Sequence, residues 1–149
     1  RYINQLAKKQ WYEEKMSKLD NVKAQKLTGM PIYESYIHDK IGEDIAADWL
    51  TQEGFAILCR NWRIGKLEID VIAIKEDFIH FIEVKTRSHH KCGEPELFVN
   101  RKKFICLQKA AQAFLTIHKK YKWVQYDVMA ITLIPQQAPL IELFWDVYY

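Results

Sequence analysis

The sequence has few cysteines and no long apolar segment, and each shortage argues against a class of protein. Its three cysteines, Cys59, Cys92 and Cys106, are odd in number and lack CxxC spacing, which argues against a disulfide framework and a structural zinc site. No window approaches the roughly 18 unbroken apolar residues of a membrane span. No secretory signal is visible, so we expect a protein of the reducing cytoplasm with no membrane partner.

A strong net charge, internal repeats and low-complexity segments are also missing. The 149 residues suffice for one hydrophobic core but not for two ordinary domains, and the net charge is only +3. The positive charge is nonetheless unevenly distributed. Between positions 85 and 103 the basic residues are Lys85, Arg87, Lys91, Arg101, Lys102 and Lys103, with His89 and His90, against two acids. A polyanion would be attracted to this part of the protein.

The spacing of apolar residues predicts an α/β domain that follows a helical segment. Residues 1–27 have a loose helical pattern that Gly29-Met30-Pro31 ends, so we divide the chain into an N-terminal helical extension, 1–35, and a domain, 36–149. Within the domain we expect helices at 35–53 and 100–118, strands at 55–62, 124–134 and 140–147, two strands within 67–88, and a loop at 88–98. This order favours a mixed five-stranded sheet flanked by helices.

Charged residues interrupt the two strands predicted within 67–88. Glu68 and Asp70 share one face of the first strand, and Glu83 and Lys85 share one face of the second. If these strands form an antiparallel hairpin around 75–77, Asp70 lies roughly opposite Glu83. Two neighbouring carboxylates repel each other unless a cation neutralises them, and oxygen ligands suit Mg²⁺ or Mn²⁺.

Such a site would fit the hydrolysis of phosphodiesters. With a metal ion on Asp70 and Glu83, Lys85 could orient or help deprotonate a water molecule, or offset charge that develops on the phosphorus. The alternative is a solvated Glu83–Lys85 ion pair on an edge strand, with Asp70 facing bulk water, because short patterns of this kind arise often by accident.

Longer blocks of the sequence favour the first interpretation. Asp70 with Glu83-Val84-Lys85 resembles the signature of the PD-(D/E)xK, or restriction-endonuclease-like, nucleases. The surrounding blocks occur in the order seen in the YraN-like family of small predicted endonucleases: Gly42–Ala47, Gly54–Leu58, Arg60–Arg63, Glu68–Asp70, Phe81–Arg87, Val99–Leu115 and Tyr126–Val128. The family usually has Gly directly before the position of Glu68, where this chain has Leu67.

The resemblance implies a restriction-endonuclease-like core and roles for individual residues. Asp70, Glu83 and Val84 would hold Mg²⁺ or Mn²⁺, Lys85 would act on the water molecule, and Glu43 would project from the helix at 35–53 toward the same cluster. Glu43 could equally be an exposed acid that the helix dipole favours in an early turn. Glu68 is either an auxiliary ligand or an ion-pair partner of Arg63.

The substrate implied by the resemblance is DNA. Candidate contacts to its backbone are Arg60, Arg63, Lys66, Arg87, Lys102 and Lys103, although basic side chains in turns and helices are often simply solvated. Similarity to archaeal Holliday-junction resolvases makes branched DNA a candidate, and symmetric cleavage would require a homodimer. Its interface could be the apolar run 143–149 or the N-terminal helix. The alternatives are a nucleic-acid-binding module that does not cleave, and a structural protein with solvated carboxylates.

Overall fold

The protein is an α/β domain, described here from a computed structural model. The structure describes residues 14, 17, 31–88 and 100–147. Its elements are α2 (Pro31–Gln52), β1 (Ala56–Ile64), β2 (Leu67–Lys75), β3 (Phe78–Arg87), α3 (Arg101–Ile117), β4 (Trp123–Thr132) and β5 (Leu140–Phe144). None of the described helices is long and apolar enough to cross a membrane. The predicted helix over 1–27, apart from two residues, and most of the predicted loop at 88–98 lie outside the described residues.

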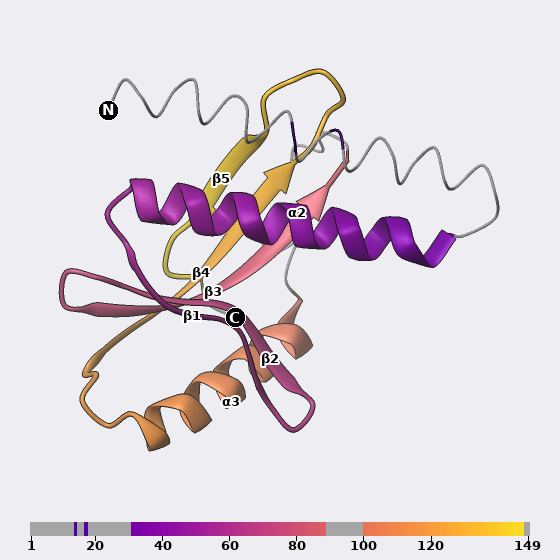
Figure 1. Cartoon of the computed structure of the whole chain (residues 1–149). Coiled ribbons are helices and arrows are strands. Elements are labelled where there is room, and N and C mark those ends of the chain that lie inside the picture. Colours follow the sequence, from indigo (N-terminus) through magenta and orange to yellow (C-terminus); the bar gives the residue numbers. More distant parts are fainter. Residues whose placement is uncertain (1–13, 15–16, 18–30, 89–99, 148–149) are drawn as a thin grey trace.

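The five strands form one mixed sheet in the order β1-β2-β3-β4-β5, which confirms the predicted fold class. β1, β2 and β3 are antiparallel neighbours, β3 and β4 are parallel, and β5 returns antiparallel to β4. A parallel pair needs a crossover connection, and α3 lies within the one that joins β3 to β4. Figure 1 shows α2 crossing the sheet and α3 running beneath it.

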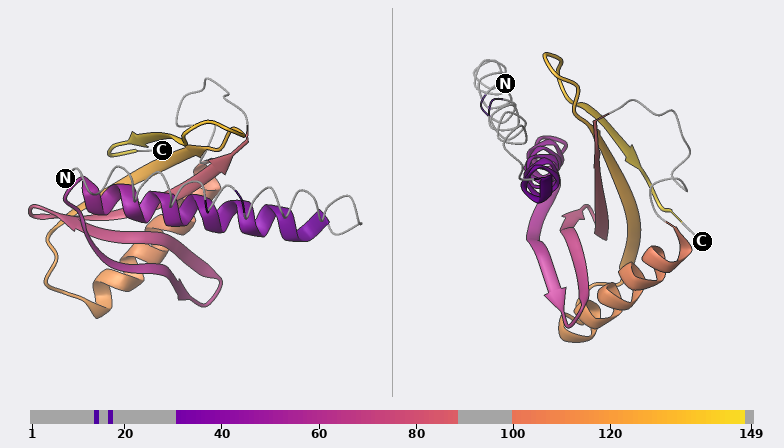
Figure 2. Two further views of the ribbon diagram at one scale, coloured as in Figure 1. Left: turned by 45° about the horizontal axis from the view of Figure 1, so that its top comes forward. Right: turned by 90° about the vertical axis from the view of Figure 1, so that its right-hand side faces the viewer.

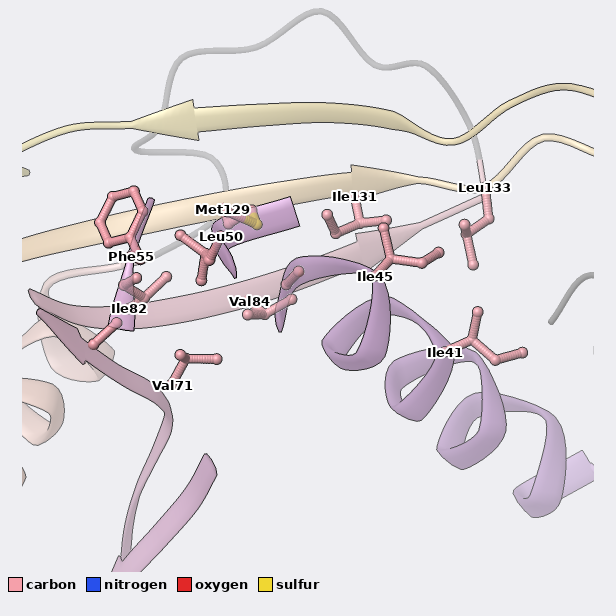
Figure 3. Packing of buried hydrophobic residues seen from close by; sticks show 12 residues of the cluster. Ile41, Ile45, Leu50, Phe55, Val71, Ile82, Val84, Met129, Ile131 and Leu133 are labelled. Atoms are coloured by element: carbon pink, nitrogen blue, oxygen red, sulfur yellow. The ribbon is translucent and has the colours of Figure 1, made fainter. Parts of the chain in front are cut away.

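Two helices cover opposite faces of the sheet and bury a core on each. Ile41, Ile45 and Leu50 of α2 pack against one face, together with Ile82 and Met129 among others (Figure 3). On the other face the apolar side of α3 packs on the remaining strand residues; this second cluster includes Leu107, Ala111, Phe114, Ile72 and Phe81. The two further views in Figure 2 show this layered arrangement. Strands that are covered on both faces read as nearly continuous apolar runs, which explains the composition of β2 and β3.

The helix boundaries follow local signals. α2 begins at Pro31, four residues earlier than expected, because proline is well suited to the first turn of a helix and lacks only an amide that would stay unpaired there. α3 begins after Asn100, whose side-chain oxygen accepts a hydrogen bond from the backbone N–H of Lys103 at 2.9 Å. Lys103 is therefore fixed in the first turn of α3.

The sheet divides between β2 and β3 at one particular point. Their antiparallel ladder runs from Lys75↔Phe78 to Val71↔Ile82. Beyond it, Leu67–Ile69 continue to pair with β1, while Glu83–Arg87 continue to pair with β4. The two strands diverge from there, as Figure 1 shows. We call this point the β2–β3 fork, and Asp70 and Glu83 are the first residues beyond the ladder.

Candidate functional site

The β2–β3 fork places Asp70 beside the backbone of β3. Instead of a further ladder bond, the N–H of Val84 donates to Oδ2 of Asp70 at 2.7 Å. This hydrogen bond connects the two diverging strands through a side chain and fixes the carboxylate of Asp70 next to Glu83. The predicted proximity of Asp70 and Glu83 is therefore a consequence of the register, in which Val71 and Ile82 are the last paired residues.

Glu83 is the most buried of the acids at the fork, with a side chain only 6% exposed. Its Oε1 atom contacts two ammonium groups, Nζ of Lys85 at 3.3 Å and Nζ of Lys103 at 2.5 Å. Lys85 lies two residues along the same strand and on the same face, as predicted. Lys103 reaches Glu83 from α3, so three elements contribute to the charged cluster.

Two clefts meet at this cluster and share Glu68, Asp70, Glu83 and Lys103 as lining residues. The first cleft, of about 360 Å³, extends toward α2 and is also lined by Lys40, Glu43, Arg63 and Lys85. The second, of about 400 Å³, extends along the start of α3 and is also lined by Lys66, Asn100, Lys102 and Cys106. The cluster is thus accessible from both sides.

Glu43 lines the first cleft because α2 lies unusually close to β3. A Cβ atom on Gly42 would be 1.8 Å from Oγ1 of Thr86, so only glycine allows this approach. Glu43 follows directly, is 13% exposed at its side chain, and forms an ion pair with Lys40 at 3.1 Å. Its negative charge contributes to the raised pKa of Asp70. The structure therefore brings Glu43 to the cluster, as the resemblance implies.

The cluster shifts the ionisation of its members in different directions. Burial, followed by repulsion from Glu83, raises the pKa of Asp70 from 3.8 to about 7, against the effect of the Val84 hydrogen bond. Burial, together with a hydrogen bond from Lys103, lowers the pKa of Lys85. Burial would also lower the pKa of Lys103, but its bonds to Glu83 and Lys85 and the two negative charges raise it. The cluster thus lowers the pKa of Lys85 and raises the pKa of Lys103.

The donor atoms at the fork suit a small, hard cation. Within the described ranges, no three His, Cys, Asp or Glu side chains are placed to hold a metal ion by themselves. Two neighbouring carboxylates, Asp70 and Glu83, are present, and Mg²⁺ commonly uses one or two carboxylates with water and phosphate oxygens as its other ligands. Burial first, and then the charge of Glu83, disfavours the ionised form of Asp70, which a bound cation would favour. The residues therefore fit Mg²⁺ or Mn²⁺ and do not resemble an all-protein cage.

Four of the basic residues predicted to contact DNA line the clefts. Arg63 lines the first, where it forms an ion pair with Glu68 at 3.1 Å and keeps a side chain that is 69% exposed. Lys66 and Lys102 line the second, and Lys103 lines both. Of the two roles considered for Glu68, the structure shows the ion pair with Arg63; Glu68 also lines both clefts, and its role as an auxiliary ligand stays a prediction.

Arg60 and Arg87 make other contacts. Arg60 joins β1 to α2 through an ion pair with Asp44 at 2.7 Å. Arg87 donates to Oγ1 of Thr132 at 2.9 Å and forms an ion pair with Glu142 at 2.8 Å, which connects β3 to β4 and β5. Neither arginine is among the described residues that line the two clefts. Their observed contacts stabilise the fold.

Sequence reasoning missed one residue that lines the site, Lys40, and one strained residue beside it, Asn61. Lys40 pairs with Glu43, and the three-residue spacing on a helix could have indicated this pair. Asn61 lies opposite Asp70 in the β1–β2 ladder, between Arg60↔Val71 and Trp62↔Ile69, and has a left-handed backbone with φ of 51°. Asparagine tolerates this conformation better than most residues, but nothing in the strand pattern pointed to it.

Comparison with known proteins places the chain in a family. The model of the uncharacterised protein family UPF0102 matches residues 42–131, from α2 to β4. A UPF0102 protein of Cytophaga hutchinsonii is 43% identical over 91 residues, which are 61% of this chain and 80% of the relative. UPF0102 protein FP2501 of Flavobacterium psychrophilum is 36% identical over 110 residues, covering 74% and 92%. UPF0102 protein THEYE_A1950 of Thermodesulfovibrio yellowstonii is 45% identical over 92 residues, covering 62% and 82%. The chain therefore belongs to the UPF0102 family, in agreement with its resemblance to YraN-like proteins.

Proposed function

We propose that this protein is a metal-dependent DNA endonuclease that hydrolyses phosphodiester bonds with Mg²⁺ or Mn²⁺. The proposal rests on one observation above all: Asp70, Glu83 and Lys85 meet at the β2–β3 fork and together line the first cleft. The solvated alternative would leave Asp70 in water, whereas Asp70 accepts a backbone hydrogen bond and has a pKa of about 7.

The carboxylates of Asp70 and Glu83 would hold the metal ion, and the resemblance adds Val84 as a ligand. When bound, the ion supplies Lewis-acid stabilisation of the charge that develops on the phosphate. The N–H of Val84 holds Oδ2 of Asp70 in place, which leaves the other lone pairs of that carboxylate for coordination. Glu43 and Glu68 line the first cleft beside this pair and would accept hydrogen bonds from water molecules there.

The two lysines would have different roles. Lys85 lies beside Glu83, and burial lowers its pKa, so it would orient or help deprotonate the attacking water molecule. Lys103 has a raised pKa and remains an ammonium ion, so it can offset negative charge on the phosphate. Groups whose environments separate their pKa values are a common way to provide a base and a cation at one site.

The basic side chains along the clefts support a polyanionic substrate. Arg63 lies on the α2 side of the cluster, and Lys66 and Lys102 lie on the α3 side, so a nucleic-acid strand could contact positive charge on both sides of the acids. Such phosphate contacts position the strand without selecting a sequence. Branched DNA is the finer proposal and comes from the resemblance to junction resolvases.

A cleavage assay with matched lysine variants tests the proposal. Linear duplex, single-stranded and four-way-junction DNA would be incubated with Mg²⁺ or Mn²⁺ and the wild-type protein, Lys85→Ala or Lys122→Ala. Loss of the proton acceptor should reduce cleavage at least about 100-fold, whereas Lys122 is an exposed lysine before β4 and its variant should retain activity.

Each other outcome has a definite meaning. Salt-sensitive DNA binding without metal-dependent cleavage would refute the nuclease and favour the non-catalytic binding module. No DNA binding in low salt would refute both functions. Equal loss in Lys85→Ala and Lys122→Ala would show that the fork is not the reactive centre.

A further inference from the structure

Lys103 occupies a position that its role as a DNA contact does not explain. Its ammonium group lies 2.5 Å from Oε1 of Glu83, closer than the 3.3 Å of Lys85, although Lys85 is on the same strand as Glu83. The positive charge of Lys103 also acts on Asp70 and favours its ionised form. Lys103 thus neutralises the same acid pair that would bind a metal ion.

The helix that supplies Lys103 is poorly suited to carry positive charge at this end. The first turn of α3 contains Arg101, Lys102 and Lys103 and no acidic residue. Cations at the amino end of a helix oppose the helix dipole and are unfavourable there. The ion pair with Glu83 offsets this unfavourable interaction with the helix dipole for Lys103. The lysine at this position therefore contributes to the charged cluster and not to the stability of α3.

We propose that Lys103 is the resident counter-ion of the Asp70–Glu83 pair and competes with a divalent metal for Glu83. When displaced from Glu83, its ammonium group would move to a backbone phosphate in the adjoining cleft. The inference rests on the proposed function, because it concerns the same acid pair, and it assigns Lys103 a positioning role that precedes any reaction.

The geometry favours Lys103 over Lys85 as the residue that moves. Lys85 is held beside Glu83 by the strand itself, since the two residues share one face of β3. Lys103 comes from a different element, its side chain is 46% exposed, and it lines both clefts. Its side chain can therefore leave Glu83 by rotamer changes alone while α3 keeps its position.

This competition has a consequence for the order of binding. A phosphate that attracts Lys103 away from Glu83 removes the competitor, so DNA and metal would strengthen each other's binding. Coupling between two ligands is reciprocal, and the same factor must apply in both directions. A free protein would then bind metal weakly, and the site would be assembled fully only with the nucleic acid present.

Binding of Mn²⁺ to the full chain without DNA tests the competition directly. Free Mn²⁺ would be measured by electron paramagnetic resonance during titration of the wild-type protein and of Lys103→Met, Lys103→Arg and Lys102→Met. We expect Lys103→Met to bind Mn²⁺ about fivefold more tightly, which corresponds to about 1 kcal/mol. Lys103→Arg keeps the charge and should remain within about twofold of the wild type by the same conversion.

Lys102→Met is the matched control, because it removes one positive charge from the same helical turn and leaves the ion pair between Lys103 and Glu83 in place. Equal gains in Lys102→Met and Lys103→Met, or unchanged or weaker binding in Lys103→Met, would overturn the inference. If Lys103→Met does not fold, Lys103→Gln replaces it, with the same expectation. If neither the wild type nor Lys103→Met binds Mn²⁺ at millimolar concentration, the proposed metal site itself is refuted.

Discussion

Replacing Asp70 with asparagine should stabilise the protein at neutral and alkaline pH. A pKa of about 7 against an ordinary 3.8 means that the folded state binds this proton more tightly than the unfolded chain does. Folding stability therefore falls as the pH rises from about 4 to about 7, where the folded protein loses the proton. At 1.36 kcal/mol per pH unit the cost at pH 8 is about 4 kcal/mol.

Asparagine removes this cost and keeps a side-chain oxygen. That oxygen can still accept the hydrogen bond that the N–H of Val84 donates to Asp70 at 2.7 Å. Its amide nitrogen needs a partner that the carboxylate does not need, so the full value is an upper limit. We expect Asp70→Asn to raise the free energy of unfolding by about 2–4 kcal/mol at pH 8 and by little at pH 4. The difference in the free energy of unfolding between Asp70→Asn and the wild type should grow as the pH rises from about 4 to about 8.

Urea denaturation between pH 4 and pH 8, followed by circular dichroism, measures this difference. Asp77→Asn is the control, because Asp77 is an exposed acid in the turn between β2 and β3. Millimolar Mg²⁺ should stabilise the wild type and leave Asp70→Asn unchanged, since only an ionised acid pair gains a ligand. A variant that is equally stable or less stable than the wild type at pH 8 would refute the account of a strained acid pair.

Two further predictions concern the framework. Gly42→Ala should lower the free energy of unfolding by about 1–3 kcal/mol, because the added Cβ would be 2.8–2.9 Å from carbons of Thr86 and closer still to its Oγ1. Combining it with Thr86→Ala should restore part of this loss, as measured by urea denaturation. Asp127→Ala should cost about 1–3 kcal/mol in the same assay, because it leaves the buried His80 without the hydrogen-bond partner that lies at 2.6 Å. Cleavage per folded molecule should be unchanged.

The strand pattern was sufficient to predict the β2–β3 hairpin and its acids. Alternation fixed which faces Asp70, Glu83 and Lys85 occupy, and the turn after Lys75 fixed which residues lie opposite each other. The ladder ends at Val71↔Ile82, so Asp70 and Glu83 are opposite neighbours as predicted. This part succeeded because period-two geometry and a short turn are local properties.

The remaining features depend on contacts between distant elements, which a single sequence does not specify. Lys103 follows Glu83 by 20 positions, and its contact depends on how α3 packs on the sheet. Arg87 belongs to a basic run, but its register neighbour in β4 is Thr132, and its guanidinium group bonds there. The strand pattern therefore predicted that Lys85 lies beside Glu83, whereas nothing in the sequence indicated that Lys103 contacts the same carboxylate.

Asn61, which lies opposite Asp70 in the β1–β2 ladder, has two unfavourable features. Its φ of 51° lies in the left-handed region, which costs a non-glycine residue about 1–2 kcal/mol, and its buried Oδ1 has no hydrogen-bond partner among the described residues. The residue opposite it is Asp70, the acid whose ionisation is most unfavourable. These three costs coincide at one position of the β1–β2 ladder, and the packed cores on both faces of the sheet offset them. Asn61 lines neither cleft, but it lies opposite an acid of the candidate site, and strain retained there while the fold packs regularly elsewhere is expected where a position is selected for binding or catalysis and not for stability.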